Sequence, residues 1–420
     1  MKILFVDMLA NIAGHTRTAA TIAQALERRG HKVSFVIAED SRADVIEAAQ
    51  LPIYRVPVRW AGRYPDLERV ISDLHALGEV DVIHSFNTRG LPETVKAAKA
   101  LRLPVFRTIC GGKTPHRVLE LKPLISLSHE IKHDLLERSS FREDEIEVIP
   151  ARIDFRALLR HAEKGSDAAQ KRFREKYSLP PTSKIVLRIA RLSTKYAKGV
   201  LQSADAVARL HKEGHDVRFV HIGFVPPGDE ANLEEVKAQF GAINRAALTT
   251  LAVSAQDEAL RAPDYLDMAD IVVGMGRTVF EGMLFKKPTV IVGKEGFAGL
   301  VGHDDTEKLA FYNFSGRHLK EAKPYEQSVT ELTSTLRELL QDEALRARVG
   351  EFGRAYVLKN LDANIAAERY EALYSSFVPE HYPSDEQLAT HLKLTPRRVA
   401  RALIPGKVHH YLHKLRHYSS

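Results

Sequence analysis

The chain has a single cysteine among its 420 residues, Cys110, and this scarcity excludes an internal disulfide framework and a cysteine-rich metal site. Long apolar runs are lacking as well, since none approaches the ~20 residues that a membrane-spanning helix needs. The first ten residues are apolar but interrupted by Asp7, so we interpret them as a strand and not as a signal peptide. These absences favour a globular protein in a reducing cytoplasm, with enough length for two domains.

Acidic residues are missing from one part of the chain only. Residues 387–420 contain seven Lys or Arg and no Asp or Glu. Subtracting those seven from the 61 basic residues leaves 54, which equals the number of acidic residues in the rest of the chain. The net charge of +7 therefore describes a basic C-terminal tail, whereas the body of the protein is neutral.

Short apolar runs alternate with amphipathic stretches along the first half of the chain. This alternation predicts parallel strands joined by right-handed helical crossovers, as in a doubly wound Rossmann-like domain. The predicted strands comprise residues 2–6, 33–37, 81–84, 105–109, 124–127 and 145–149. The first predicted helix, residues 18–29, is followed by Gly30, which is suited to a C-cap.

The same pattern begins again after a polar helical stretch at residues 157–177. The predicted elements of this second series include strands at residues 184–190 and 217–222 and a helix at residues 200–212. We therefore predict an α/β fold with two doubly wound Rossmann-like domains facing a cleft, at residues 1–158 and 159–363, and a basic helical tail at 379–420. Ligands of such folds bind at the carboxyl ends of the parallel strands.

Residues 269–293 have the pattern strand, glycine loop, helix, strand. Gly274 and Gly276 open the loop, and the helix begins near Thr278. A glycine turn that leads into a helix directs backbone N–H groups and the positive end of the helix dipole toward one point, which suits a phosphate. Glu281 lies one turn inside the helix, where it can accept hydrogen bonds from hydroxyl groups. The segment therefore predicts a site for a sugar nucleotide.

This segment resembles the donor-binding segment of the GT-B glycosyltransferases and is most similar to the retaining family 4. That family has Glu-Gly-Phe-Gly and, further along, a second glutamate. Residues 273–276 read Val-Gly-Met-Gly, so the first glutamate is missing, and Glu281 matches the second. The resemblance implies that the two glycines and Thr278 bind the donor phosphates and that Glu281 holds the ribose. Arg277 is a candidate third cation or, alternatively, a residue that faces solvent.

Arg191 and Lys198 match the two cations with which this family grips the donor pyrophosphate. Negative charge develops on the diphosphate as the sugar leaves, and fixed cations stabilise that charge. The resemblance therefore implies catalytic roles for Arg191 and Lys198. Lys195 is the alternative lysine, because an insertion before Gly199 widens the spacing. Without the resemblance, solvated surface cations would explain the pair equally well.

Gly14 and His15 lie between the first predicted strand and the first helix, where the family has a glycine-rich loop close to the donor phosphates. His15 is a candidate catalytic residue, and a loop histidine that caps the helix is the alternative. The same Gly-His pair resembles the loop of the inverting transferase that adds N-acetylglucosamine to the peptidoglycan lipid. The stereochemistry of transfer is therefore left open.

Asn87 and Lys113 follow two further strands and are candidate residues on the acceptor side. Cys110 occupies the position at which the family commonly has a histidine that contacts the donor sugar. A cysteine nucleophile needs a lowered pKa and a neighbouring base. We expect Cys110 to be a small buried hydrophobe instead.

Residues 364–378 are predicted to be helical, and in the GT-B fold the last helix crosses back to complete the first domain. An apolar face at residues 408–415, bordered by basic and histidine side chains, predicts an amphipathic helix on an anionic membrane surface. The alternatives are a helix docked on the body, a disordered basic end, and a helix-turn-helix at residues 385–403 that binds DNA.

We therefore expect a cytoplasmic hexosyltransferase, peripheral at the inner membrane face. It would move a sugar from a nucleotide-diphosphate donor to a glycan or lipid-linked acceptor with retention, in polysaccharide or envelope glycan synthesis. Neither a metal nor another cofactor is expected, since the cations would stabilise the leaving diphosphate. The alternatives are an inverting N-acetylglucosaminyltransferase-like enzyme, a nucleotide-sugar 2-epimerase of the same architecture, and a DNA-binding protein. An epimerase would need clustered carboxylates, which the sequence does not show.

Overall fold

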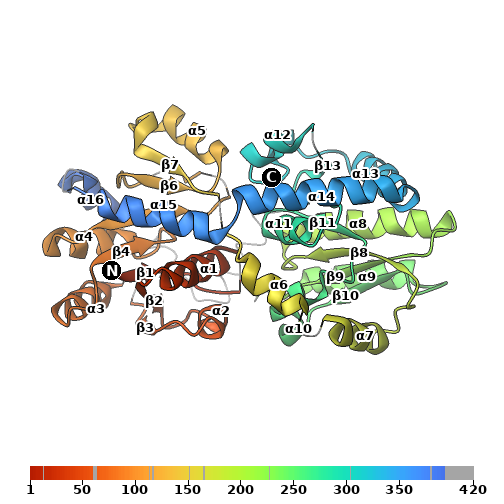
Figure 1. Cartoon of the computed structure of the whole chain (residues 1–420), viewed down its shortest axis with the longest axis horizontal. Coiled ribbons are helices and arrows are strands. Elements are labelled where there is room, and N and C mark those ends of the chain that lie inside the picture. Colours follow the sequence, from red (N-terminus) through yellow and green to blue (C-terminus); the bar gives the residue numbers. More distant parts are fainter. Residues whose placement is uncertain are drawn as a thin grey trace. The chain divides into compact units, whose positions relative to one another are not determined.

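The computed structural model describes the chain except for residues 13, 60–63, 113, 116–117, 151, 164–165, 227, 303, 379–380 and 393–420. The chain divides into two compact units, one formed by Met1–Arg152 with Ala363–Ser420 and the other by Ile153–Asp362 (Figure 1). Each unit is an α/β domain built on its own sheet, which confirms the predicted fold class. The division falls a few residues before the predicted 158/159, because Ile153 and Phe155 pack in the core of the second unit.

The first unit has a seven-stranded parallel sheet in the order β3-β2-β1-β4-β5-β6-β7. Its strands are β1 (Lys2–Val6), β2 (Lys32–Ala38), β3 (Ile53–Val56), β4 (Val82–Ser85), β5 (Val105–Ile109), β6 (Leu124–Ser126) and β7 (Ile146–Val148). Sequence reasoning missed β3, an edge strand that is mostly half-buried or exposed and so lacks a continuous apolar run. The chain reverses its direction across the sheet between β1 and β4, so the loops after these two strands open at one topological switch point.

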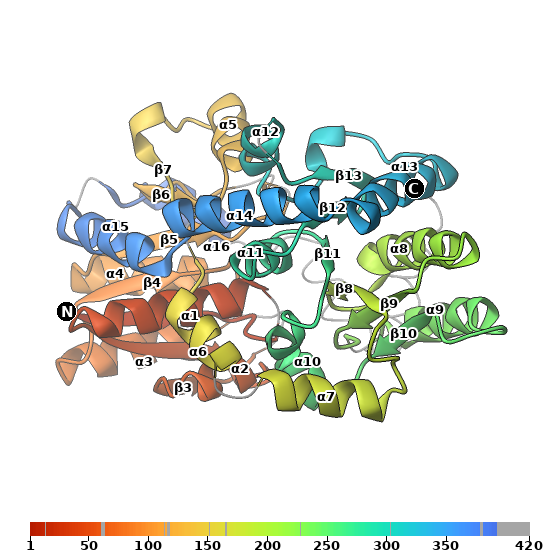
Figure 2. The same ribbon diagram turned by 45° about the vertical axis from the view of Figure 1, so that its right-hand side comes forward.

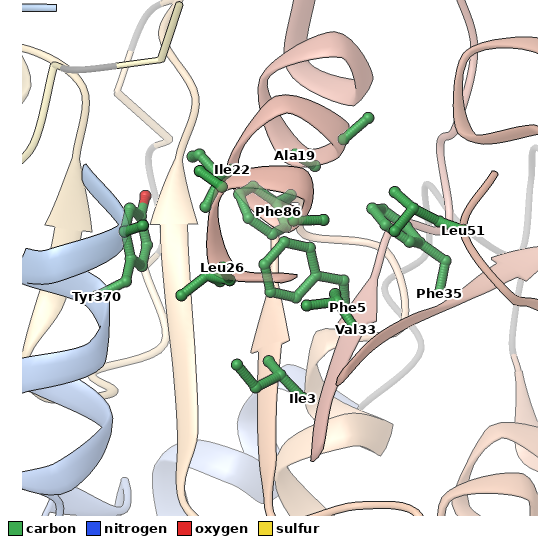
Figure 3. Close-up of a cluster of buried hydrophobic side chains, with 14 of the residues drawn as sticks. Ile3, Phe5, Ala19, Ile22, Leu26, Val33, Phe35, Leu51, Phe86 and Tyr370 are labelled. Carbon is green, nitrogen blue, oxygen red and sulfur yellow. The ribbon is translucent and has the colours of Figure 1, made fainter. Parts of the chain in front are cut away.

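Helices cover the sheet of the first unit. They are α1 (Gly14–Arg28), α2 (Asp44–Ala48), α3 (Pro65–Ala76), α4 (Leu91–Leu101), α5 (His129–Arg138), α15 (Ala363–Ser375) and α16 (Asp385–Leu392), with a 3-10 turn at Glu143–Glu145. Figure 3 shows the apolar core between β1, β2 and α1, with Tyr370 of α15 beside it. The late helix α15 therefore belongs to the unit built by the first residues of the chain, packed against α1.

A buried polar network fastens α15 to the sheet. The two ring nitrogens of His84 lie 2.7 Å from the Tyr374 hydroxyl and 2.8 Å from Thr108 Oγ1. Thr108 Oγ1 in turn lies 3.1 Å from the Tyr370 hydroxyl. Burial lowers the pKa of His84 to about 3, so the imidazole is neutral and both of its nitrogens are used in hydrogen bonds.

The second unit has a six-stranded sheet in the order β10-β9-β8-β11-β12-β13. Its strands are β8 (Lys184–Ile189), β9 (Val217–Ile222), β10 (Thr250–Val253), β11 (Ile271–Gly274), β12 (Thr289–Gly293) and β13 (Gly296–Leu300). The strands are parallel except β13, which pairs antiparallel with β12 at the edge. The order reverses between β8 and β11, and this switch point is the counterpart of the one between β1 and β4.

Two layers of helices enclose this sheet. The helices are α6 (Phe155–Glu163), α7 (Ser166–Lys176), α8 (Thr194–Lys212), α9 (Glu230–Ile243), α10 (Gln256–Leu260), α11 (Arg277–Leu284), α12 (Thr306–Phe311), α13 (Tyr325–Gln341) and α14 (Glu343–Asn360), with 3-10 turns at Ala262–Tyr265 and Arg317–Leu319. Helix α13 lies beside α8, and α14 lies beside α11 (Figure 2). Among the described residues, no helix combines the length and apolarity that a membrane crossing requires.

The beginning of the basic tail is docked on the first unit. Lys99 Nζ of α4 lies 2.6 Å from Asp385 Oδ1 of α16, and Leu388 is buried in the apolar cluster that includes α3 and α4. The amphipathic segment at residues 408–415 and the second half of the predicted helix-turn-helix lie outside the described residues.

Candidate active site

The switch point of the first unit is organised around a buried carboxylate. Asp7 follows the last residue of β1 and is fully buried. Thr16 Oγ1 donates a hydrogen bond to Asp7 Oδ2 at 2.8 Å, and Asn87 Nδ2 donates one to Asp7 Oδ1 at 2.6 Å. The backbone N–H of Leu9 also donates to Oδ1, at 3.3 Å. The predicted acceptor-side residue Asn87 is therefore held at the loop after β1.

His15 lies beside the same carboxylate. Its Nε2 is 3.5 Å from Asp7 Oδ1 and 3.1 Å from the Leu9 carbonyl oxygen. The His15 side chain is 23% exposed and that of Asp7 is 0% exposed, so a partly open imidazole faces a buried anion. A carboxyl group beside an imidazole can support a general base, so the position of His15 fits its candidate role.

The remaining candidates of the first unit differ in what surrounds them. Gly14 opens α1, and apart from its chain neighbours and its own helix, no described atom lies within 4 Å of the position that a Cβ would take. Cys110 is partly buried and packs against the core, and burial followed by the charge of Asp7 raises the pKa of its thiol to about 12. A neutral thiol is a poor nucleophile, so Cys110 has the properties of a small apolar residue. Lys113 lies outside the described residues.

In the second unit, two cations flank one tyrosine after β8. The guanidinium carbon of Arg191 lies 5.2 Å, and Lys195 Nζ 5.3 Å, from the centre of the Tyr196 ring. Although burial alone would raise it, the charges of Lys195 and Arg191 and their hydrogen bonds lower the pKa of the Tyr196 hydroxyl. A lowered phenol pKa indicates a strongly positive environment at this loop.

Helix α8 begins earlier than the sequence predicted. The expected start at residue 200 is wrong, because the inserted residues continue the helix back to Thr194 and bury Ala197 one turn before Val200. Both candidate lysines, Lys195 and Lys198, therefore lie in the first turns of α8. Lys195 is exposed beside Tyr196, whereas Lys198 Nζ lies 3.5 Å from the carbonyl oxygen of Lys323.

The loop between β11 and α11 meets the end of β8. Gly276 has φ +60° and ψ −126°, a conformation that glycine adopts without strain, and its N–H donates to the Phe314 carbonyl oxygen at 2.9 Å. Thr278 Oγ1 donates to the carbonyl oxygen of Ile189, the last residue of β8, at 2.6 Å. At Gly274, a Cβ would lie 3.4 Å from the Thr278 methyl group. The starts of α8 and α11 thus share one edge of the sheet.

Glu281 and Arg277 form an ion pair on α11. Arg277 Nε lies 2.7 Å from Glu281 Oε1, and their side chains are 17% and 5% exposed. The predicted third cation therefore contacts the predicted ribose-binding carboxylate in the free protein. Arg277 holds one oxygen of Glu281, so this pair positions the carboxylate at the first turn of the helix.

Comparison with known families accounts for both halves of this arrangement. The model of the glycosyl transferase 4-like domain matches residues 13–144, and the model of the glycosyl transferases group 1 matches residues 169–356. The chain is a GT-B glycosyltransferase. The first model covers both His15 and Asn87. The second covers the segments that follow β8 and β11. No curated protein sequence matches this glycosyltransferase significantly.

Solved structures share the fold of this glycosyltransferase at low sequence identity. A glycosyltransferase from Rickettsia africae has TM-score 0.68 and 17% identity, over 89% of this chain and 97% of its own. Anabaena Alr3699/HepE in complex with UDP and glucose has TM-score 0.64 and 18% identity, over 90% and 100%. The UDP-GlcNAc 2-epimerase from Neisseria meningitidis bound to UDP-GlcNAc has TM-score 0.55 and 13% identity, over 90% and 100%. Transferases and an epimerase share this fold, so the family models and not the fold identify the enzyme class.

Sequence reasoning missed three residues at or near the carboxyl ends of β1 and β8 in the glycosyltransferase: Asp7, Arg188 and Tyr196. Asp7 was used only to exclude a signal peptide, although an acid directly after a buried strand signals a site at the sheet edge. Tyr196 was passed over inside the insertion. Arg188, on β8, was read as part of a strand, although a charged residue in an otherwise apolar buried strand is unusual.

Proposed function

We propose that this glycosyltransferase moves a sugar from a nucleoside-diphosphate sugar to a glycan or lipid-linked acceptor, and that its second unit binds the donor. The observation that carries the proposal is the convergence of Arg191, Lys195 and the starts of α8 and α11 at the β8–β11 switch point. Two helix N-termini and two cations favour a diphosphate at this edge. Lys198 lies one turn further along α8 and would reach the diphosphate from the side of that helix.

The donor groups take distinct roles in this proposal. Arg191 and the lysines stabilise the charge that develops on the diphosphate as the bond to the sugar breaks. Glu281 accepts hydrogen bonds from the ribose hydroxyls, and Arg277 fixes the orientation of its carboxylate. The glycine loop and Thr278 support the start of α11 beneath the phosphates. Protein cations supply the charge stabilisation, so the proposal requires no metal or other cofactor.

We propose transfer with retention of the anomeric configuration, because such a reaction can proceed without a protein nucleophile. The raised pKa of Cys110 supports this, since its thiol is neutral at neutral pH. Asn87 and Lys113 are proposed to contact the acceptor. An acceptor of polysaccharide or envelope glycan synthesis at the inner membrane face would suit the basic tail, whose charge attracts anionic lipid.

An inverting transferase is the second candidate, and the Asp7–His15 pair favours it. In such a reaction a base accepts the proton of the acceptor hydroxyl while that hydroxyl attacks the sugar. His15 is partly exposed and lies beside a buried carboxylate, as a base of this kind would.

Two measurements test the proposal. A thermal-shift screen of UDP-, GDP- and ADP-sugars should show stabilisation by one class of donor, since a ligand that binds only the folded state raises its stability. Product analysis by NMR with that donor then gives the anomeric configuration and separates retention from inversion. Release of an epimerised nucleotide sugar without transfer, or the absence of stabilisation by every donor, would contradict the proposal.

A further inference from the structure

One buried cation of the second unit has no anionic partner among the residues that the structure describes. Arg188 is 0% exposed, and its Nη2 donates to the Val292 carbonyl oxygen at 3.1 Å. Its Nε and Nη1 have no hydrogen-bond partner among the residues that the structure describes. Burial lowers the pKa of Arg188 to about 10, and Tyr196 acts in the opposite direction. The guanidinium is therefore charged at neutral pH.

Two more buried polar side chains of the same unit, one of them opposite Arg188, have no hydrogen-bond partner among the described residues. His221 lies opposite Arg188 in the β8–β9 register, and within the described part of the chain both of its ring nitrogens lack partners. Burial and then the charge of Arg188 lower the pKa of His221 to about 3, so this ring is neutral and does not add to the positive charge. The side-chain amide of Gln202, on α8, likewise has no partner among the described residues.

Arg188 is the penultimate residue of β8, three positions before Arg191 and close in sequence to the start of α8, where Lys195 lies. A Cβ on Gly199, in the second turn of α8, would be 2.9 Å from Arg188 Nη2, so the guanidinium touches the helix backbone. The contact with Val292 brings it to the carboxyl end of β12. The ionisable side chain that acts on it, Tyr196, is also the one that Arg191 and Lys195 flank.

Burying an unpaired charge lowers the stability of a fold. Stability therefore does not explain the presence of Arg188, whereas binding of an anionic ligand would. Its electrostatic effect is strong, because a charge in the low-dielectric interior acts over several ångströms with little screening. A diphosphate at the starts of α8 and α11 would supply the missing negative charge.

We propose that Arg188 is a positioning residue of the donor site, whose buried charge strengthens binding of the nucleoside diphosphate through the wall formed by Gly199 and Tyr196. The inference rests on the proposed function of the second unit. Arg188 does not contact the diphosphate and acts by its field on the phosphates and on the loop that grips them. Arg188 would join Arg191 and Lys195 as the third fixed cation of the donor site, in place of Arg277, which is paired with Glu281.

The test compares Arg188→Met with Arg218→Met. Arg218 is a second buried arginine of the same sheet. It lies at the amino end of β9, away from His221, the register partner of Arg188, and it pairs with Asp216 at 3.0 Å. Calorimetry measures the dissociation constants of UDP, GDP and ADP. The corresponding nucleosides, uridine, guanosine and adenosine, are measured in the same way as ligands without phosphate. We expect R188M to weaken binding of the preferred diphosphate at least tenfold, about 1.4 kcal/mol. Binding of the nucleoside, which lacks phosphate, should not change, and R218M should bind both ligands as the wild type does.

Two more variants separate charge from structure. Arg188→Lys keeps the charge and should restore most of the affinity, whereas Arg188→Gln keeps a donor for Val292 but no charge and should behave as R188M does. Arg188→Gln also serves if R188M does not fold. Equal losses for diphosphate and nucleoside, a failure of lysine to restore binding, or wild-type affinity in R188M and R188Q would overturn the inference. If the wild-type protein binds none of the three diphosphates, the proposed function itself fails.

Discussion

The two units share a topology but differ at their switch points. In the first unit, buried Asp7 receives hydrogen bonds from Thr16, Asn87 and the Leu9 N–H. In the second unit, Arg188 is buried, and no described residue accepts a hydrogen bond from its Nε or Nη1. Near one switch point a buried carboxyl group is fully hydrogen-bonded, whereas near the other a buried guanidinium has two donor atoms without a partner among the described residues. This difference agrees with the proposed roles, a base in the first unit and a binding site for an anionic donor in the second.

The largest expected effect tests the cationic character of the second unit. Under the proposed function, Arg191→Ala should lower kcat/KM for the sugar nucleotide by roughly 100-fold or more, because the variant would lose a cation that stabilises the developing charge. Steady-state kinetics with the donor identified by thermal shift would measure it. Arg209→Ala is the control, since Arg209 lies on α8, the helix that follows Arg191 in the chain, and is paired with Glu326. Equal activity of the Arg191→Ala and Arg209→Ala variants would contradict the proposed cationic character of the switch point in the second unit.

A matched pair of histidines tests whether the buried polar groups differ in their contribution to stability. His84→Leu should lower the free energy of unfolding by about 2 kcal/mol, because the hydroxyls of Tyr374 and Thr108 lose their partner. His221→Leu should change it by less than about 0.5 kcal/mol, because neither ring nitrogen has a described partner to lose. Urea denaturation followed by circular dichroism gives both values. A greater loss in H221L than in H84L would contradict the comparison.

Acidification should destabilise both units through the same two histidines. The folded pKa of each is about 3, whereas an unfolded histidine has about 6.5, so the unfolded chain binds the proton first. Their contribution to stability is complete above pH 6.5 and is lost as the pH falls toward 3, by about 1.4 kcal/mol per pH unit for each histidine. Unfolding measured from pH 7 to pH 4 should show a shallower slope in H221L than in the wild type. An unchanged slope would show that His221 titrates normally in the folded state.

The smallest expected effects come from two glycines near the starts of helices. Gly199→Ala should destabilise the protein by about 1 kcal/mol, because the new Cβ would lie 2.9 Å from Arg188 Nη2 and 3.3 Å from the Gly293 carbonyl oxygen. Gly14→Ala should leave stability within about 0.5 kcal/mol, because among the described residues no atom beyond its chain neighbours and its own helix lies within 4 Å of its Cβ position. Thermal unfolding without ligand separates the two. A larger loss in G14A would indicate a strained loop in the first unit.

Much of the fold could be predicted because it is encoded locally. The apolar runs at residues 2–6 and 184–190 predicted β1 and β8, and the pattern at residues 269–293 predicted β11, α11 and β12. The errors have local causes too. β3 is too exposed to give an apolar run, and the start of α8 was missed because its first residues are polar.

The candidate site was only partly predictable. Arg191, His15 and Glu281 were identified as single residues from motif positions, and the structure places each at a sheet edge or a helix start. Their partners were not predicted. Arg277 was a candidate third cation or a residue facing solvent, and its ion pair with Glu281 was not foreseen. An ion pair between residues four apart on a helix is sterically favoured, but the sequence does not say whether the arginine turns toward the glutamate or toward a ligand.

The sequence by itself determined the alternation of strands and helices, the two-unit α/β class and the motifs by which family models match the chain. Only the tertiary structure decided which residues meet. Asn87 contacts Asp7 across 80 positions and Arg188 contacts Val292 across 104, because the order of strands in each sheet sets these neighbours. Local propensity fixes each element, but strand order follows from how the elements bury their apolar faces together. That packing gave one switch point a fully hydrogen-bonded carboxyl group and the other a buried guanidinium with no anionic partner among the described residues.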